Sequence, residues 1–387
     1  MLLTGNHAVA YGVRDAAAEV IAAYPITPQT QIVEKLAEFV EKGQMRARYV
    51  RVESEHSAMA ACIAAVACGA RSFTATSSQG LLYMSELVFW AGLGRFPVTM
   101  AVVTRTLAPP WSIWNEHTDI LSQRDAGWII VMCENAQEAY DTAIQAFRIA
   151  EDERLLQPVM YGLDAFSISH TAEEVDLLEK GDVEGYLPPL DPKKLRVYMD
   201  PENPGTFGNL VGPDTMMEMR YSIKEAFERA RGVIKEAVKE YERVSGRRQA
   251  GLIEEYRCRD AEVVIVTMGA SSGDAKDAVD ALRERGVRAG LLRLRVIRPL
   301  PREEILEAVK GAKVVATVDR NYSFGHGNIL GGELAGFVKN TMCRFVAGLG
   351  GRDLTPEDFQ GIALKALDVA EKGEDKGKEE FWWGLKR

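Results

Sequence analysis

The chain has 387 residues, of which 47% are hydrophobic and 27% are charged, so it has enough apolar surface for a large folded core. Its formal net charge of −9 argues against nucleic acid or an anionic membrane as the main partner. No apolar run approaches the roughly 18 residues of a membrane span, and no basic residue precedes the first apolar ones, as a secretory signal requires.

Residues 1–170 alternate short apolar runs with helical patterns, which predicts an α/β fold with a doubly wound, mainly parallel sheet. An Ala-rich helix is expected from about residue 57 to 67. Another helix starts after Asn135, whose side chain caps it while Glu138 completes a capping box. The expected strands cover residues 20–24, 48–53, 72–76, 98–104, 128–133 and 159–163.

The rest of the chain divides into a connecting segment and a second, smaller α/β domain. Acidic residues and prolines predict a long surface linker from residue 171 to about 215, followed by a charged, solvated helix over residues 216–244. Strands are then expected at residues 262–268, 289–296, 313–318 and 344–347. We therefore predict domains at 1–170 and 259–387, with the linker and charged helix at 171–258.

Four polar segments directly follow, or end, four predicted strands of the first domain. They are residues 24–28, 53–56, 76–80 and 104–106. Ligands of a doubly wound sheet bind at the carboxyl ends of its strands, so we expect these segments to gather into one crevice.

Thr27 and Glu55 are the first candidates in these segments. Thr27 lies between two prolines that fix its backbone, so its hydroxyl and N–H are aimed at an anion, unless Thr27 or Gln29 only caps the next helix. A buried Glu55 would exchange a proton with a ligand nitrogen. The alternatives are a helix N-terminal carboxylate stabilised by the helix dipole, and Glu53 as the functional acid.

Arg105 and residues 77–79 complete the candidates. A guanidinium at the end of an apolar strand suits bidentate binding of a carboxylate, although it also suits a salt bridge to Glu116 or Asp119. The side chains of Ser77, Ser78 and Gln79 either line a cofactor pocket or cap the helix that follows.

Cysteine and histidine spacing gives no support for a metal site. The five cysteines are scattered without a CxxC pair, which argues against a disulfide framework and indicates a reducing, cytoplasmic location. The same spacing argues against an iron–sulfur cluster or zinc ion held by this chain alone.

Together, several motifs resemble one known family. They are YPITPQT at residues 24–30, VESEHSAMAA at 52–61, TSSQG at 76–80, RTLAPPWSIW at 105–114, SQRDAGW at 122–128 and FVAGLGGRD at 345–353. With these motifs in this order and at this spacing, the chain resembles the alpha subunit of a 2-oxoacid:ferredoxin oxidoreductase of the pyruvate or branched-chain type.

The resemblance implies a division of labour among subunits. The first domain would hold the pyrimidine end of thiamine diphosphate, and a smaller transketolase-C-terminal-like domain would follow it. The beta subunit would hold the diphosphate and Mg²⁺, and [4Fe-4S] clusters would lie on the beta and delta subunits. A gamma subunit would complete an anaerobic, cytoplasmic heterotetramer that uses coenzyme A as co-substrate and ferredoxin as electron acceptor.

The resemblance also assigns roles to residues. Glu55 matches the glutamate that hydrogen-bonds N1′ of the aminopyrimidine, and thereby favours the tautomer that removes the C2 proton. Thr27 and Arg105 match the residues that bind the substrate carboxylate. Ser77, Ser78 and Gln79 are expected at the cofactor.

The implied reaction is oxidative decarboxylation of pyruvate to acetyl-CoA and CO₂, with branched-chain 2-oxoacids such as 2-oxoisovalerate as the alternative substrates. Two other classes stay open at this point. One is a transketolase-like synthase split over two chains, and the other is a non-catalytic scaffold subunit.

Overall fold

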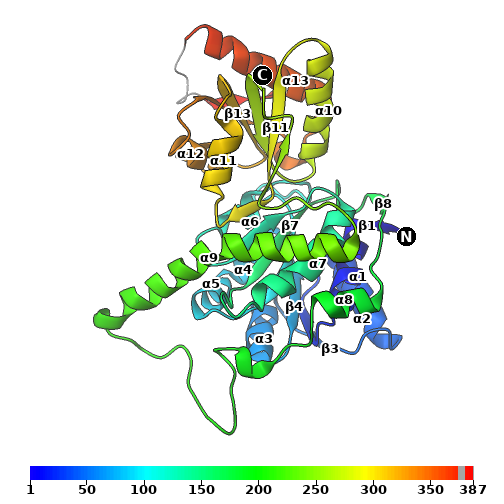
Figure 1. The fold of residues 1–387 in the computed structure, drawn as a ribbon. Coiled ribbons are helices and arrows are strands. Elements are labelled where there is room, and N and C mark those ends of the chain that lie inside the picture. Colours follow the sequence, from blue (N-terminus) through cyan, green and yellow to red (C-terminus); the bar gives the residue numbers. More distant parts are fainter. Residues whose placement is uncertain (374–379, 387) are drawn as a thin grey trace.

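The computed structural model describes residues 1–373 and 380–386. Two mainly parallel sheets with helices on their faces lie one above the other, and the long helix α9 (Pro213–Ser245) runs along the lower one (Figure 1). The predicted α/β class is confirmed.

The first sheet has seven strands and contains every strand that the sequence predicts in residues 1–170. Its only antiparallel pair joins β6 to β12, a short strand from much later in the chain. In spatial order the strands are β12 (Val296–Arg298), β6 (Ile129–Met132), β7 (Val159–Asp164), β5 (Thr99–Thr104), β4 (Ser72–Thr76), β2 (Val20–Ala23) and β3 (Arg48–Arg51).

Helices cover both faces of this sheet because successive side chains of its buried strands point to opposite sides. Phe73 and Val103 face one helical layer, whereas Met100 and Val102 face the other. The first layer contains α1 (Gly5–Asp15), α2 (Thr30–Glu41), α7 (Ala136–Ala150), α8 (Lys180–Tyr186) and α9. The second contains α3 (Glu55–Ala67), α4 (Ser78–Tyr83), α5 (Ser85–Gly94) and α6 (Thr118–Ser122).

Within the described residues the second sheet has six strands, of which only the edge strand β9 is antiparallel. Helices α10 (Ser271–Glu284) and α13 (Pro356–Glu371) cover one face, and α11 (Arg302–Val309) and α12 (Ile329–Ala335) cover the other. Its strands are β15 (Glu380–Trp382), β14 (Thr341–Val346), β13 (Val314–Asp319), β10 (Val263–Thr267), β11 (Ala289–Leu294) and β9 (Ile253–Tyr256).

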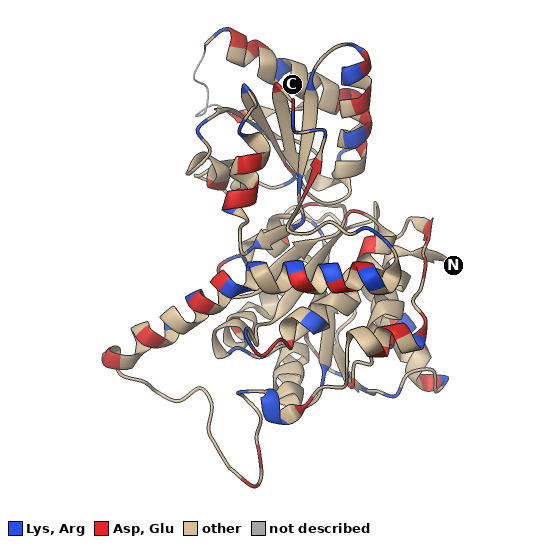
Figure 2. Cartoon of the chain, in the orientation of Figure 1, with Lys and Arg blue, Asp and Glu red and all other residues tan. Residues whose placement is uncertain are grey.

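The segment between the sheets starts with β8 (Ala172–Glu174), which pairs with the N-terminal strand β1 (Leu2–Thr4), and includes a short 3₁₀ turn at Pro192–Lys194. The predicted charged helix is α9, which starts three residues earlier because Pro213 occupies its first turn, a favoured position for proline. Charged residues of both signs recur along α9 (Figure 2), and the buried residues of the helix lie between Ala226 and Tyr241.

One local prediction is wrong. Asn135 caps α7 as expected, but Glu138 does not complete a capping box on Asn135. Its carboxylate instead accepts the backbone N–H of Glu134 and is bound by Arg293 and Arg295. The two arginines come from the second sheet region, and their charge outweighs a local hydrogen bond to the cap residue.

Within the described residues, no helix is long and apolar enough to cross a bilayer.

Candidate functional site

The predicted crevice forms at one edge of the first sheet. Strands β5, β4, β2 and β3 are adjacent and parallel, so their carboxyl ends lie together. Arg105 links three of the segments directly: its Nη1 donates to the carbonyl of Thr27 at 2.7 Å and its Nη2 donates to Oε1 of Gln79 at 2.9 Å. Arg105 therefore contacts both Thr27 and Gln79.

Glu55 lies at the first position of α3, after the capping residue Ser54. Its side chain is close to Gly80: a Cβ built on that glycine would lie 2.6 Å from both Glu55 Oε1 and Thr76 Oγ1. Glu55 is only 7% exposed, yet among the described residues its carboxylate has no ion pair or hydrogen-bond partner. A nearly buried carboxylate without a protein partner is an unfavourable arrangement unless a ligand supplies the donor.

Arg105 is 4% exposed and binds neutral groups rather than a carboxylate. The alternative of a salt bridge to Glu116 or Asp119 is wrong, because Asp119 accepts the backbone N–H of Arg105 and not its guanidinium. Burial lowers the pKa of Arg105, and the nearby charge of Asp119 partly opposes this shift. A guanidinium nevertheless stays charged in proteins, so Arg105 offers a positive charge to an anionic ligand.

The capping alternative for Thr27 and Gln29 is also wrong. Gln29 is the N-cap residue of α2, but its side chain makes no capping bond. Its Nε2 donates to the carbonyls of Tyr24 and Ala75, which ties the loop after β2 to the end of β4. Thr27 is exposed, and its backbone carbonyl, already used by Arg105, points into the site.

Ser77, Ser78 and Gln79 differ in whether their side chains have a hydrogen-bonding group left for a ligand. Ser77 Oγ donates to the carbonyl of Val103 at 2.7 Å and is buried. Ser78 Oγ lies within hydrogen-bond distance of two acceptors, Gln79 Oε1 at 2.6 Å and the carbonyl oxygen of Thr106, which share its single hydrogen. Only Gln79 retains an unused group, since its Nε2 has no partner within the described residues.

Several buried polar atoms in this region lack a hydrogen-bond partner in the part of the chain that the structure describes. They include Gln29 Oε1, Thr76 Oγ1, Gln79 Nε2 and Arg105 Nε. Each buried group without a partner costs about 1–3 kcal/mol, so the arrangement favours a polar ligand. Together with Glu55, they suit a flat heteroaromatic ring with both donors and acceptors, such as an aminopyrimidine, beside a small anion.

From the sequence, Asp119 was considered only as a possible salt-bridge partner of the Arg105 guanidinium. Asp119, at the start of α6, is fully buried and accepts hydrogen bonds from the backbone of Ser78 and Arg105. The only signal in the sequence is an acidic residue immediately before the apolar pair Ile120 and Leu121.

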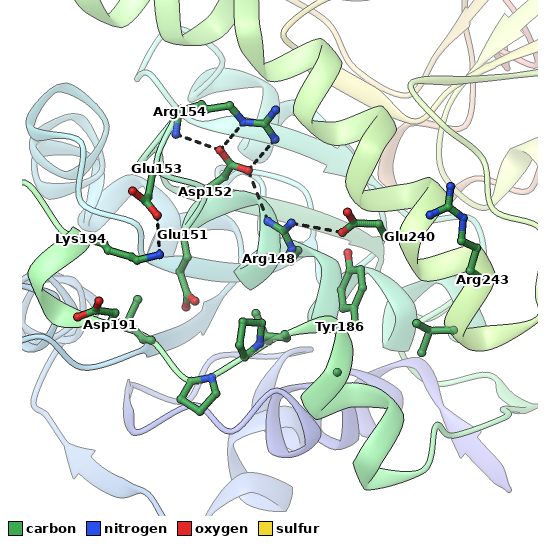
Figure 3. A pocket seen from close by; sticks show the side chains of 16 residues that line it. Arg148, Glu151, Asp152, Glu153, Arg154, Tyr186, Asp191, Lys194, Glu240 and Arg243 are labelled. Carbon is green, nitrogen blue, oxygen red and sulfur yellow. Dashed lines mark hydrogen bonds and ion pairs between the residues drawn. The ribbon is translucent and has the colours of Figure 1, made fainter.

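Another cleft lies away from the crevice and offers no comparable chemistry. It has a volume of about 850 Å³ and lies between α7, α8 and α9. Its charged side chains are joined in ion pairs: Arg148 with Asp152 and Glu240, Arg154 with Asp152, and Lys194 with Glu153 (Figure 3). These pairs neutralise one another, so the cleft has no strong attraction for an anionic substrate.

Two family profiles cover most of the chain. The profile described as pyruvate flavodoxin/ferredoxin oxidoreductase, thiamine diphosphate-binding, matches residues 11–239. The profile described as pyruvate:ferredoxin oxidoreductase core domain II matches residues 261–359.

Relatives with two different names are about equally similar. Pyruvate synthase subunit PorA of Methanothermobacter thermautotrophicus is 42% identical over 386 residues, covering 100% of this chain and 98% of the relative. Ketoisovalerate oxidoreductase subunit VorA of Pyrococcus horikoshii is 45% identical over 391 residues, with the same coverage.

Solved structures share the fold at low sequence identity. The 2-oxoglutarate:ferredoxin oxidoreductase of Magnetococcus marinus matches with a TM-score of 0.76 at 18% identity, covering 95% of this chain and 65% of that one. A split-gene transketolase, in an inactive tetramer, matches with a TM-score of 0.57 at 14% identity, covering 95% and 99%.

Proposed function

Because this chain belongs to the pyruvate flavodoxin/ferredoxin oxidoreductase family, we propose that it is the alpha subunit of a 2-oxoacid:ferredoxin oxidoreductase. The enzyme oxidatively decarboxylates a 2-oxoacid, transfers the acyl group to coenzyme A and passes the electrons to ferredoxin. The single observation that carries the site assignment is Glu55, a nearly buried carboxylate without a partner in the described residues, beside Gly80.

Glu55 is the group that we assign to the cofactor. When bound, thiamine diphosphate supplies the nucleophilic carbon that attacks the keto group of the substrate. Glu55 would hold and exchange a proton at N1′ of its aminopyrimidine. Gly80 lets the ring come close, since a side chain there would occupy the space next to the Glu55 carboxylate. Gln79 Nε2 is the further donor that we assign to the cofactor.

Arg105 and Thr27 are the groups that we assign to the substrate carboxylate. The guanidinium is held by Thr27 and Gln79, so its orientation is fixed before the substrate binds. A fixed cation that positions the carboxylate also positions the keto carbon, which lowers the entropic part of the barrier.

We assign the remaining cofactor sites of the enzyme to other subunits. We propose that a beta subunit binds the diphosphate with Mg²⁺, and that [4Fe-4S] clusters lie on the beta and delta subunits of a cytoplasmic heterotetramer with a gamma subunit. The scattered cysteines support this division. Directly after Gly80, helices α4 and α5 expose Leu82, Tyr83, Phe89 and Trp90, and we assign this face to the beta subunit.

The experiment that tests the function is an assay of the whole complex. The complex is purified under argon through a tag on this chain, and ferredoxin or viologen reduction is measured with coenzyme A. Pyruvate and 2-oxoisovalerate are compared by kcat/KM, because relatives with both names are equally similar. An apolar pocket separates such substrates by only about 1–3 kcal/mol, so we expect activity with both and a preference for pyruvate. A cluster-containing complex that reduces neither acceptor with any 2-oxoacid would favour a scaffold role.

Replacing Arg105 by alanine should raise KM for the 2-oxoacid about 100-fold, because a charge-assisted bidentate contact contributes about 3 kcal/mol. Binding of thiamine diphosphate should survive, which isothermal titration calorimetry of the assembled complex measures. The matched control is Arg46→Ala, since Arg46 is exposed and precedes β3, at the end of that strand opposite to the crevice. An unchanged KM in Arg105→Ala would make Arg105 a structural residue.

A further inference from the structure

Asp119 lies directly behind the candidate site and does not belong to the groups assigned to ligands. Its side chain is fully buried at the start of α6. One carboxylate oxygen, Oδ2, accepts the backbone N–H groups of Ser78 and Arg105, each at 2.9 Å. The other oxygen accepts the N–H of Ile120 at 2.7 Å. Within the described residues, all its side-chain hydrogen bonds therefore come from the backbone.

The two residues that Asp119 holds start the segments on which the site depends. Ser78 has a φ of 48°, a left-handed conformation that is unfavourable for a serine and persists only when its surroundings fix it. Gln79 and Gly80 follow directly, and Gly80 faces Glu55. On the other side, Arg105 begins where β5 ends.

Asp119 Oδ2 thus binds the segment next to Glu55, which we assign to the cofactor, and the residue Arg105, which we assign to the substrate. Because both N–H groups bind the same atom, the backbone of Ser78 and the backbone of Arg105 have one fixed separation. The side-chain contact between Gln79 Oε1 and Arg105 Nη2 depends on that separation.

We propose that Asp119 is a positioning residue for this site, and that its carboxylate fixes the Arg105 guanidinium relative to the Gln79–Gly80 turn that faces Glu55. The expected change in KM rests on the proposed function. The expected change in backbone hydrogen bonding at Ser78 and Arg105 rests on geometry alone. Asp119 acts through Ser78 and Arg105 and touches neither cofactor nor substrate.

The charge state of Asp119 gives the proposal a pH dependence. Burial raises the pKa of Asp119 to about 7, against the three backbone N–H groups that favour the ionised form, and the charge of His117 also lowers it. Arg105 also interacts with the charge of Asp119, and the titratable residue of α4, which packs against α6, is the exposed Tyr83. Protonation as pH falls through about 7 weakens the acceptor, so the hold on Ser78 and Arg105 is strongest above that pH.

The test uses the assembled complex with Asp119→Ala, Asp119→Asn and the control Asp125→Ala, in which an exposed aspartate six residues further on is removed. We expect KM for the 2-oxoacid to rise about tenfold in Asp119→Ala, in line with the sensitivity of catalysis to small displacements. Asp119→Asn keeps one oxygen but no charge, so its KM should lie between those of the wild type and the alanine variant. The wild-type KM should rise as pH falls from 8 to 6, and that rise should be absent in Asp119→Asn.

Amide hydrogen exchange gives a readout that does not need activity. In Asp119→Asn, the peptides that contain Ser78 and Arg105 should exchange faster than in the wild type, while peptides from α9 should not change. If Asp119→Ala does not assemble, the asparagine variant decides by the same measurement. A wild-type KM in Asp119→Ala, or unchanged exchange at both peptides in Asp119→Asn, overturns the proposal. A wild-type complex without 2-oxoacid activity would count against the proposed function only, and the exchange data would still decide on Asp119.

Discussion

Replacing Glu55 by glutamine should slow C2 proton exchange of bound thiamine diphosphate by about 10²–10⁴-fold, the usual contribution of a positioned acid–base group. Glutamine has nearly the same shape, so it fits beside Gly80 and the fold should survive. An amide does not exchange a proton with N1′ in the way that a carboxyl group does. The rate is measured in the assembled complex by transfer into D₂O, an acid quench and NMR of the C2 proton.

The matched control for this prediction is Glu53→Gln. Glu53 is the competing acid two residues earlier, and it is exposed and hydrogen-bonded to Ser57 Oγ at 2.5 Å. The hydrogen bond of Ser57 lowers the pKa of Glu53, so it is ionised and already has a partner. If Glu53→Gln slows the exchange and Glu55→Gln leaves it at the wild-type rate, the roles of the two residues were assigned the wrong way round.

The largest effect on stability is expected from Glu138→Ala, at about 3–5 kcal/mol, because it removes the shared partner of two buried arginines. Arg293 donates to the Glu138 carboxylate at 2.7 and 3.0 Å, and Arg295 donates to it at 3.0 Å. Both arginines are at most 2% exposed. The cluster joins α7 on the first sheet to the strand β11 of the second, so its loss should also weaken the contact between the two sheets.

The pH dependence of this effect follows from the ionisation of Glu138. Burial opposes ionisation, but the charge and hydrogen bonds of Arg293, with the charge of Arg295, outweigh it and hold the pKa of Glu138 at about 2. A lowered pKa in the folded state stabilises the fold above the pKa of the unfolded chain. The difference between wild type and variant should therefore be constant above about pH 5 and shrink as pH falls towards 2.

The measurement is the urea concentration at which the assembled complex unfolds, followed at several pH values. The control is Glu307→Ala, which removes an exposed glutamate that forms only a surface pair with Lys310. Surface changes of this kind alter stability by no more than about 0.5 kcal/mol. Equal urea midpoints of unfolding for Glu138→Ala and Glu307→Ala would show that the buried cluster makes no net contribution to the free energy of unfolding.

The sequence alone determined the α/β architecture and the segments that meet at the crevice. Buried parallel strands are continuous apolar runs, and the polar residues that end them stand out at once, as Glu55 and Arg105 do. Because the carboxyl ends of parallel strands lie at one edge of a sheet, the ends of the predicted strands were expected to gather there whatever the strand order. The cap at Asn135 was predictable for the same reason, since a helix cap is a contact between near neighbours.

Only the tertiary structure decided the partners of the charged groups. Glu138 fits a capping box by sequence, but its partners Arg293 and Arg295 lie more than 150 residues later and reach it only when the two sheets pack. The sequence suggested Asp119 as a possible partner of the Arg105 guanidinium. In the structure Asp119 instead accepts the backbone N–H groups of Arg105 and Ser78. Local sequence patterns report on interactions between near neighbours. The partner of a buried charge depends instead on which distant groups are buried next to it. Because an unpaired buried charge is costly, the charge pairs with whichever suitable group the tertiary structure places there.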